Sequence, residues 1–439
     1  MTSKPQELAA VAPREVLTVT EETNSAPQSP FGDQFSDVEA PELEPMLKSS
    51  VARRWIRDIH DMVGNDMYPF QQTMQSKSGP AVVSNSRDMF MLSSYDYLGL
   101  LGHPYIENAS INAIRNYGTG TGGARMLAGT NQLHRALEAK IAAFKRKPAA
   151  ITFSSGYMAN LAVINGIVQK SDRIIIDENV HRSLIDAIYM AQVECVKFRH
   201  NDLEHLRELL AEETTAKKTF IVIEGVYSME GDLCPLPEIV ELKKEFGAYL
   251  ILDESHSLGL YGENCRGVDE HFNVNPEDID VFTSAMSKCV PSGGGFLACS
   301  EQTVTVLQHS ATPFVFSCAM SPANTAACLA AFEVIEKEGP ERLKKVFENA
   351  NYLKKHLKRL GYNVGKTQSP IIPVIIGNKE KTLRLSARLY ALGILANPVI
   401  FPAIPPGEDR LRLCVTAAQS KYMLDEIILA FGMCRSIVE

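Results

Sequence analysis

Residues 248–296 decide the fold, and they read AYLILDESHSLGLYGENCRGVDEHFNVNPEDIDVFTSAMSKCVPSGGGF. The apolar run at 249–252 predicts a buried strand that ends in the carboxylate Asp253. A second short strand is predicted at 280–283, and Lys288 follows it. A carboxylate after one strand and an amine after the next are therefore expected at the same edge of a sheet.

These groups are the ones that pyridoxal phosphate requires. A lysine forms a Schiff base with its aldehyde, and an acid pairs with its pyridine nitrogen, so that the ring accepts electrons from a substrate carbanion. His256 follows Asp253 by three residues, and the glycines at 293–295 allow close approach of the backbone to the cofactor. Taken alone, Asp253 is also typical of a helix cap, and Lys288 of a charged surface residue. Their order along the chain, each after a predicted strand, favours a cofactor site.

Composition narrows the classes of protein. The chain has 439 residues, 45% of them hydrophobic and 22% charged, which predicts a large core in two packed domains. The net charge of −8 argues against nucleic acid binding. No apolar run of about 18 residues predicts a membrane span. The nine cysteines form no CxxC pair and no signal peptide pattern is present, which fits a cytoplasmic protein. Cys289 lacks a flanking base, which argues against a nucleophile.

Four segments are expected along the chain. Residues 1–48, rich in Pro, Ser, Glu, Gln and Thr, predict a disordered acidic tail, with docking to a partner as the alternative. Residues 49–100 predict an N-terminal arm that begins with an amphipathic helix. Residues 101–316 predict a large cofactor-binding domain, and residues 317–439 a smaller α+β domain. The latter is expected to open with two helices, at 322–338 and 341–360.

The large domain alternates strands with helices. Strands are expected at 149–153, 173–177 and 219–224, besides the two already quoted, and this alternation predicts a mostly parallel α/β sheet. Ligands of such sheets bind beyond the carboxyl ends of the strands. Polar residues that follow these ends predict one shared pocket: 154–160, His181, Ser228, Asp253, His256 and Lys288.

Three motifs have a functional and an ordinary interpretation. The turn with Ser155, Gly156 and Tyr157 opens a helix, and its N-terminus suits a phosphate dianion or a plain cap. His181 suits a core histidine, a metal ligand or a ring that stacks on the cofactor, and no ligand at metal spacing accompanies it, so no metal is expected. A GxGxxG match at 118–123 follows a helix rather than a strand, which makes it a weak dinucleotide motif.

The full motif set resembles the α-oxoamine synthases, pyridoxal phosphate enzymes of the aspartate aminotransferase fold (fold type I). The resemblance covers roughly residues 90–435, and its texture is closest to serine palmitoyltransferase. It rests on five signatures: YGTGTGGARMLAGTNQLHRALE at 117–138, FSSGYMAN at 153–160, EGVYSMEGD at 224–232, LDESHSLGLYGENCRG at 252–267 and SKCVPSGGG at 287–295.

The resemblance implies a role for each site residue. Lys288 is implied as the Schiff-base lysine and base, His181 as the stacking ring, and Asp253 as the partner of the pyridine nitrogen. His256 and Ser228 are implied near the phenolic oxygen, with Arg412 and Tyr95 at the substrate. The family's usual threonine is replaced by Ala285, and an arginine by Ile400. Further implied cofactor contacts are Ser155, Gly156, Tyr157, Thr283, Ser284, Ser287 and, from a neighbouring subunit, Ser317.

The implied reaction is a decarboxylative condensation of serine, alanine or glycine with an acyl thioester, giving an α-amino ketone. The acyl donor is implied to be acyl-CoA or an acyl-carrier protein, and the assembly a homodimer with shared sites. Two alternatives stay open: another pyridoxal phosphate reaction on this fold, such as transamination or aldol cleavage, and a non-catalytic partner subunit.

Overall fold

The computed structural model describes residues 43–439 and divides them into two compact units. The first ends at Asn65 and contains η2 (Pro45–Leu47) and the amphipathic helix α1 (Ser50–Gly64). The second spans Asp66–Glu439. Most of the tail expected at 1–48, namely residues 1–42, lies outside the described residues. Within the described part, no helix is long and apolar enough to cross a membrane.

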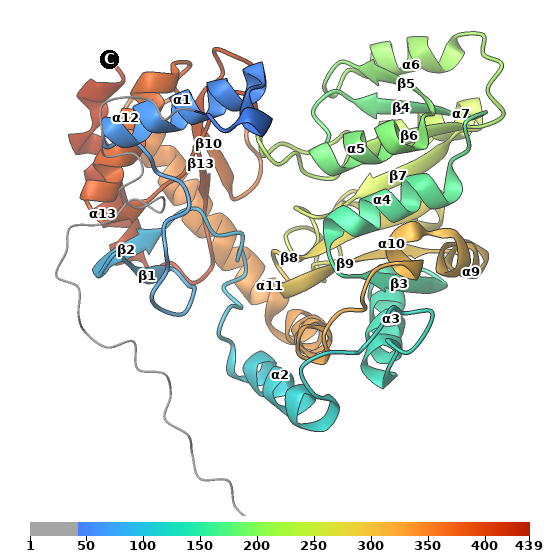
Figure 1. Ribbon diagram of the computed structural model, residues 1–439. Coiled ribbons are helices and arrows are strands. Elements are labelled where there is room, and N and C mark those ends of the chain that lie inside the picture. Colours follow the sequence, from blue (N-terminus) through green and yellow to red (C-terminus); the bar gives the residue numbers. More distant parts are fainter. Residues whose placement is uncertain (1–42) are drawn as a thin grey trace, which may run out of the picture. The chain divides into compact units, whose positions relative to one another are not determined.

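A seven-stranded sheet forms the centre of the second unit (Figure 1). All neighbouring strands are parallel except β9, which runs antiparallel between β3 and β8. The sequence analysis predicted no strand at β9, because its run of small residues carries little strand signal. The strands in spatial order are β3 (Ala149–Phe153), β9 (Pro291–Cys299), β8 (Val281–Ser287), β7 (Tyr249–Asp253), β6 (Thr219–Glu224), β4 (Arg173–Asp177) and β5 (Glu194–Phe198).

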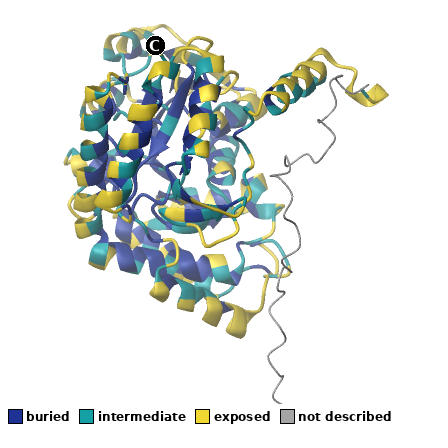
Figure 2. Ribbon diagram, turned by 90° about the vertical axis from the view of Figure 1, so that its left-hand side faces the viewer, coloured by how far each residue is buried: buried dark blue, intermediate teal, exposed yellow. Residues whose placement is uncertain are grey.

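Helices connect and cover these strands, most of whose residues are buried. In Figure 2, which faces the side of the smaller sheets, dark blue buried strands lie beneath helices that carry exposed residues. α4 packs against β8 and β9, and it also contacts α5. The helices before and between the strands are α2 (Pro104–Tyr117), α3 (Gln132–Lys145), α4 (Gly156–Ile167), α5 (Arg182–Ala191), α6 (Leu203–Ala211), α7 (Leu236–Phe246), α8 (Val268–His271), η3 (Pro276–Asp278), α9 (Glu301–Ser310) and α10 (Thr312–Val315).

Two three-stranded sheets complete the unit. One joins β1 (Ala81–Ser84), β2 (Arg87–Met91) and β11 (Ile394–Leu395). The other joins β10 (Ile371–Ile375), β13 (Arg410–Cys414) and β12 (Pro398–Val399), and it has its own hydrophobic cluster. The remaining helices are α11 (Pro322–Arg359), α12 (Lys379–Ala391), α13 (Lys421–Met433) and η4 (Arg435–Ile437).

The two helices expected at 322–338 and 341–360 are one helix, α11, of 38 residues. A proline inside a helix removes one N–H and clashes with the preceding turn, which is why Pro340 predicted a break. Packing on both sides of Pro340 outweighs that penalty. Phe332 lies in the core of the seven-stranded sheet, whereas Leu353 and Leu357 lie in the hydrophobic cluster of the β10–β13–β12 sheet.

Candidate active site

Three polar residues stand side by side where the parallel pairing of β6, β7 and β8 ends. The register pairs Glu224 of β6 with Asp253 of β7, and Asp253 with Thr283 of β8. All three are buried. Burial raises the pKa of Glu224 well above its ordinary value, and the charge of Asp253 adds to that rise.

Asn160, on the second turn of α4, fixes the side chains of this row. Its Nδ2 donates to Asp253 Oδ2 at 2.8 Å and to Ser183 Oγ at 2.8 Å. Its Oδ1 accepts from Thr283 Oγ1 at 2.7 Å. Asp253 Oδ1 in turn accepts from the backbone N–H of Ser255 at 2.8 Å. A buried carboxylate needs such donors, and these hold Asp253 in one orientation.

Lys288 follows the last residue of β8. Burial lowers the pKa of its ammonium group from the usual value. The negative charges of Asp253 and Glu224 oppose this shift, while the positive charge of Arg412 adds to it. Lys288 thus lies within electrostatic reach of the row and of Arg412, in an environment that favours a neutral amine.

Both predicted histidines join the site. His181 is the N-cap of α5, its Nδ1 lies 2.7 Å from Ser183 Oγ, and its backbone N–H donates to Glu224. His256 Nδ1 lies 2.9 Å from the hydroxyl of Tyr97. Burial lowers the pKa of both rings, for His256 well below its usual range. Both are therefore expected to be neutral imidazoles that act as hydrogen-bonding and stacking groups.

Arg412 reaches the site from β13. Its guanidinium carbon lies 4.8 Å from the ring centroid of Tyr95, and its Nη2 contacts the Tyr95 hydroxyl. Its Nη1 donates to the carbonyl of Ser228 at 3.2 Å. Arg410, two residues earlier, instead pairs with Glu230 at 3.2 Å and Glu408 at 2.7 Å. Of these two arginines, Arg412 is the one whose charge acts on Lys288.

The N-terminus of α4 lies against β8 and β9. Ser155 caps the helix by accepting from Met158 N at 3.2 Å. A Cβ added to Gly156 would lie 2.6 Å from the Cβ of Ala285 and 2.9 Å from its Cα. Gly295 approaches the backbone of Ser155 and Gly156 just as closely. The glycines bring the helix N-terminus, a ready anion site, up to the ends of the strands.

Several of the other predicted cofactor contacts make hydrogen bonds within the chain. The Thr283 hydroxyl donates to Asn160, and the Ser284 hydroxyl to its neighbour's carbonyl at 3.3 Å. Tyr157 is exposed and donates to Asp186 at 2.6 Å. Ser287 is exposed and Ser317 half-buried.

Comparison with known proteins shows which family has this sequence and this arrangement of residues. The family model for aminotransferases of class I and II matches residues 87–431. The 8-amino-7-oxononanoate synthase of Thermoanaerobacter pseudethanolicus is 38% identical over 82% of this chain and 90% of its own length. The serine palmitoyltransferase of Bacteroides thetaiotaomicron is 36% identical over 82% of this chain and 91% of its own. The chain belongs to the α-oxoamine synthases of the aminotransferase class I and II family.

Solved structures agree with this family. Serine palmitoyltransferase from Sphingomonas wittichii superposes with a TM-score of 0.85 at 31% identity, covering 91% of this chain and 99% of that one. A serine palmitoyltransferase with pyridoxal phosphate as internal aldimine also gives a TM-score of 0.85, at 29% identity and 89% coverage of this chain. This α-oxoamine synthase is thus a pyridoxal phosphate-dependent enzyme of the acyltransferase type with the expected fold.

The residues of this synthase fit the cofactor. Asp253 is an oriented carboxylate in a buried row, and Lys288 is an amine within its electrostatic reach. The N-terminus of α4 offers backbone N–H groups to a phosphate. Ala285 lies so close to Gly156 that a side chain at position 156 would not fit. An acceptor for a protonated ring nitrogen, an amine for an aldehyde and N–H donors for a phosphate are therefore all present at one sheet edge.

Two site residues escaped sequence reasoning. Asn160 appeared only within a longer motif, and Glu224 only as the end of a strand. A sequence signal for Glu224 was available, because Glu224 ends one predicted strand just as Asp253 ends another. No sequence signal identified Asn160, since its partners lie 23, 93 and 123 residues away.

Proposed function

We propose that this enzyme condenses a small amino acid with an acyl thioester, losing carbon dioxide and releasing the thiol to give an α-amino ketone. The observation that carries this proposal is the grouping of Lys288 and Asp253, at one edge of the large sheet, with Arg412 of β13: Asp253 and Arg412 are both among the charges that act on the Lys288 amine. Pyridoxal phosphate supplies the electron sink for the carbanion when it is bound. The proposed substrates are serine, alanine or glycine.

Each side chain has a defined task in this proposal. Arg412 binds the amino acid carboxylate, because a guanidinium offers two parallel donors to it. Lys288 holds the cofactor between turnovers and then removes the α-proton, for which its lowered pKa is suited. Asp253 meets the ring nitrogen, and the neutral His181 lies against the ring. His256, held by Tyr97, completes the donors near the phenolic oxygen.

Cofactor phosphate is assigned to the N-terminus of α4. The backbone N–H groups that follow Ser155 are its main donors, and Ser284 and Ser287 replace the threonine that Ala285 displaces. Gly156 and Tyr157 belong to the same turn. This assignment is supported by the close packing of Gly156 on Ala285, which brings the turn up to β8.

We also propose a homodimer in which Ser317 serves the partner's site. Support comes from an apolar surface around the bridge between Ala124 and Cys318, where Leu127 and Phe316 are 82% and 83% exposed. Contiguous exposed apolar patches on a protein surface often mark interfaces. The nine cysteines all carry free thiols, which supports a cytoplasmic location. The acyl donor is proposed to be acyl-CoA or an acyl-carrier protein.

The test uses purified holoenzyme and its Lys288→Ala variant. The wild type should keep a visible cofactor absorbance through dialysis, shift it with serine, alanine or glycine, and then release thiol from an acyl-CoA series. Lys288→Ala should lose the dialysis-resistant absorbance and at least about a thousandfold of the thiol release, as expected when the residue that acts as both base and nucleophile is removed.

Other outcomes point to other functions. Turnover of an amino acid with a 2-oxo acid, without any thioester, would indicate a transaminase and contradict the proposal. A wild-type chain that binds cofactor yet forms no α-amino ketone with any donor would indicate a non-catalytic subunit.

A further inference from the structure

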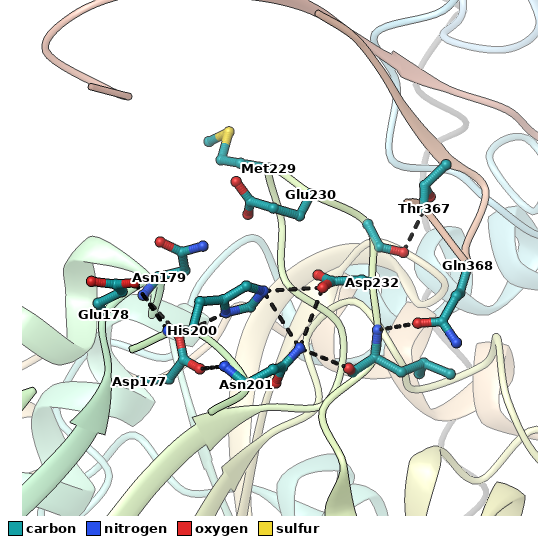
Figure 3. Close-up of polar contacts among 12 residues, drawn as sticks. Asp177, Glu178, Asn179, His200, Asn201, Met229, Glu230, Asp232, Thr367 and Gln368 are labelled. Carbon is teal, nitrogen blue, oxygen red and sulfur yellow. Dashed lines mark hydrogen bonds and ion pairs between the residues drawn. The ribbon is translucent and has the colours of Figure 1, made fainter. Parts of the chain in front are cut away.

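A histidine outside the catalytic row bridges two carboxylates. His200, just after β5, places Nδ1 2.9 Å from Asp177 Oδ1 and Nε2 3.0 Å from Asp232 Oδ2 (Figure 3). Asp177 ends β4, and Asp232 belongs to the loop that follows β6. The imidazole is thus bound on both nitrogens, and it connects two segments that are 55 residues apart in sequence.

The first segment is the turn that delivers His181. Asp177 Oδ1 accepts from Asn179 N at 2.9 Å, and Asp177 Oδ2 accepts from Asn201 N at 2.9 Å. The chain then reaches His181, and the charge of Lys288 helps to lower the pKa of its ring. Asp177 therefore shapes the backbone between the end of β4 and a residue of the site.

The second segment is the loop 226–233. It closes on itself through Gly231 N to Tyr227 O at 2.8 Å and Tyr227 N to Asp232 O at 3.1 Å. Asn201, next to His200, adds a bond from Nδ2 to the carbonyl of Leu233 at 3.1 Å. The base of the loop is consequently tied to the β4–β5 edge of the large sheet.

The tip of the same loop holds the arginines of β13. The Ser228 carbonyl accepts from Arg412, and Glu230 pairs with Arg410 at 3.2 Å. The Gly231 carbonyl accepts from the N–H groups of Gln368 and Ser369, both at 3.0 Å. Gly231 has φ +72, and a Cβ there would lie 2.5 Å from the carbonyl of Ile371, so only glycine allows this approach.

Charge strengthens the bridge. Burial disfavours the charged ring, but hydrogen bonds and charges from Asp177 and Asp232 together raise the pKa of His200 to about 10. His200 is therefore a cation near neutral pH, and its two contacts are charge-assisted hydrogen bonds. Groups of three or more His, Cys, Asp or Glu that suit a metal ion are absent from the described residues, so the cluster is an ion-pair network.

We propose that His200 is a positioning residue for the amino acid substrate. It joins the turn that ends at His181 to the loop that holds Arg412, so that both side chains meet the substrate in a fixed relation. The inference rests on the proposed role of Arg412 in carboxylate binding. His200 acts only through these neighbours and does not touch the reacting atoms.

The experiment titrates the cofactor absorbance of the holoenzyme with L-serine, L-alanine and glycine. In His200→Gln the Kd should rise about tenfold, as expected when a buried charged partner is lost. The absorbance at saturation should match that of the wild type, and kcat for thiol release should change less than about twofold. A split between Kd and kcat is what a positioning role predicts and a general loss of stability does not.

A matched control is His103→Gln. His103 is similarly buried and pairs with one carboxylate, Glu338, at 3.4 Å, but it contacts no site loop. Its variant should keep the wild-type Kd. An unchanged Kd in His200→Gln would overturn the proposal, as would a fall in kcat with Kd preserved.

A second variant covers the case in which His200→Gln does not fold. Asp232→Asn keeps a hydrogen-bond acceptor for Nε2 but removes one charge, and it should raise Kd about threefold. A wild-type Kd in this variant would also count against the proposal. Failure of the proposed function would look different, because the wild type itself would then show no absorbance shift with any of the three amino acids.

Discussion

At the scale of single residues, the site depends on groups that hydrogen bonds and close packing hold in position. Asp253 is held by Asn160 and by the backbone of Ser255, so its carboxylate is oriented before any cofactor binds. Such preorganisation avoids a reorganisation cost during the reaction. Gly156 helps to position the backbone. Because it has no side chain, α4 can approach Ala285 closely.

The change Gly156→Ala tests this close approach. Alanine normally stabilises a helix relative to glycine, but here its Cβ would lie 2.6 Å from the Cβ of Ala285. We expect overpacking to lower the free energy of unfolding by about 1–3 kcal/mol and to weaken retention of the cofactor. Thermal unfolding and absorbance after dialysis measure both. Gly79→Ala is the control, since its nearest atom lies 3.9 Å away; equal behaviour of the two variants would contradict the prediction.

At the scale of elements, helix α4 links the strand ends into one rigid edge. Its first turn packs on β8 and β9. Its second turn places Asn160 against Asp253 of β7, Thr283 of β8 and Ser183 of α5. One amide thus satisfies polar groups from three elements, and buried groups of this kind are costly to leave unpaired.

Replacing the Asn160 amide should remove the hydrogen bonds that tie α4 to Asp253 and Thr283. In Asn160→Leu, the Thr283 hydroxyl and one Asp253 oxygen lose their partner, which we expect to cost about 2–3 kcal/mol of stability. Denaturant unfolding measures the loss, and the cofactor absorbance should weaken with it. Asn165→Leu is matched in residue type and helix, but its side chain donates only to two carbonyls. A cofactor absorbance that Asn160→Leu keeps and Asn165→Leu loses would reverse our interpretation.

At the scale of the whole molecule, the exposed apolar surface around Leu127 and Phe316 supports the proposed homodimer. The glycine-rich loop at 118–123 continues into Leu127, and Ala319 N donates to Gly123 O at 3.1 Å, which brings Phe316 beside the same loop. Ser317 follows directly, so a partner seated here would lie next to a residue proposed to serve its site. Assembly and cofactor binding are therefore expected to be coupled.

The change Leu127→Asp places a charge in this proposed interface. We expect it to shift sedimentation of the holoenzyme from dimer to monomer at micromolar concentration, because an unpaired buried charge is strongly unfavourable. Cofactor retention should fall in parallel. Leu429→Asp is the control, on an exposed position of α13. A wild-type chain that sediments as a monomer with its cofactor bound would show that no partner is needed.

The sequence by itself determined the alternation of strands and helices in the large domain and the polar residues that follow several strands, although it predicted neither β5 nor β9. Asp253, Lys288 and His181 were predicted because short-range patterns mark a strand end, and all parallel strands end at one edge. The structure brings these three together with Arg412. Ser155 was predicted with its helix, since a cap is a local feature.

Only the tertiary structure decided which side chains meet across that edge. The register that aligns Glu224 with Asp253, the amide of Asn160 and the His200 bridge each join residues far apart in the chain. Local patterns carry no information on such pairs, because they exist only after the strands have paired. The unbroken α11 has the same cause, since packing on both sides of Pro340 overrides the local preference for a break.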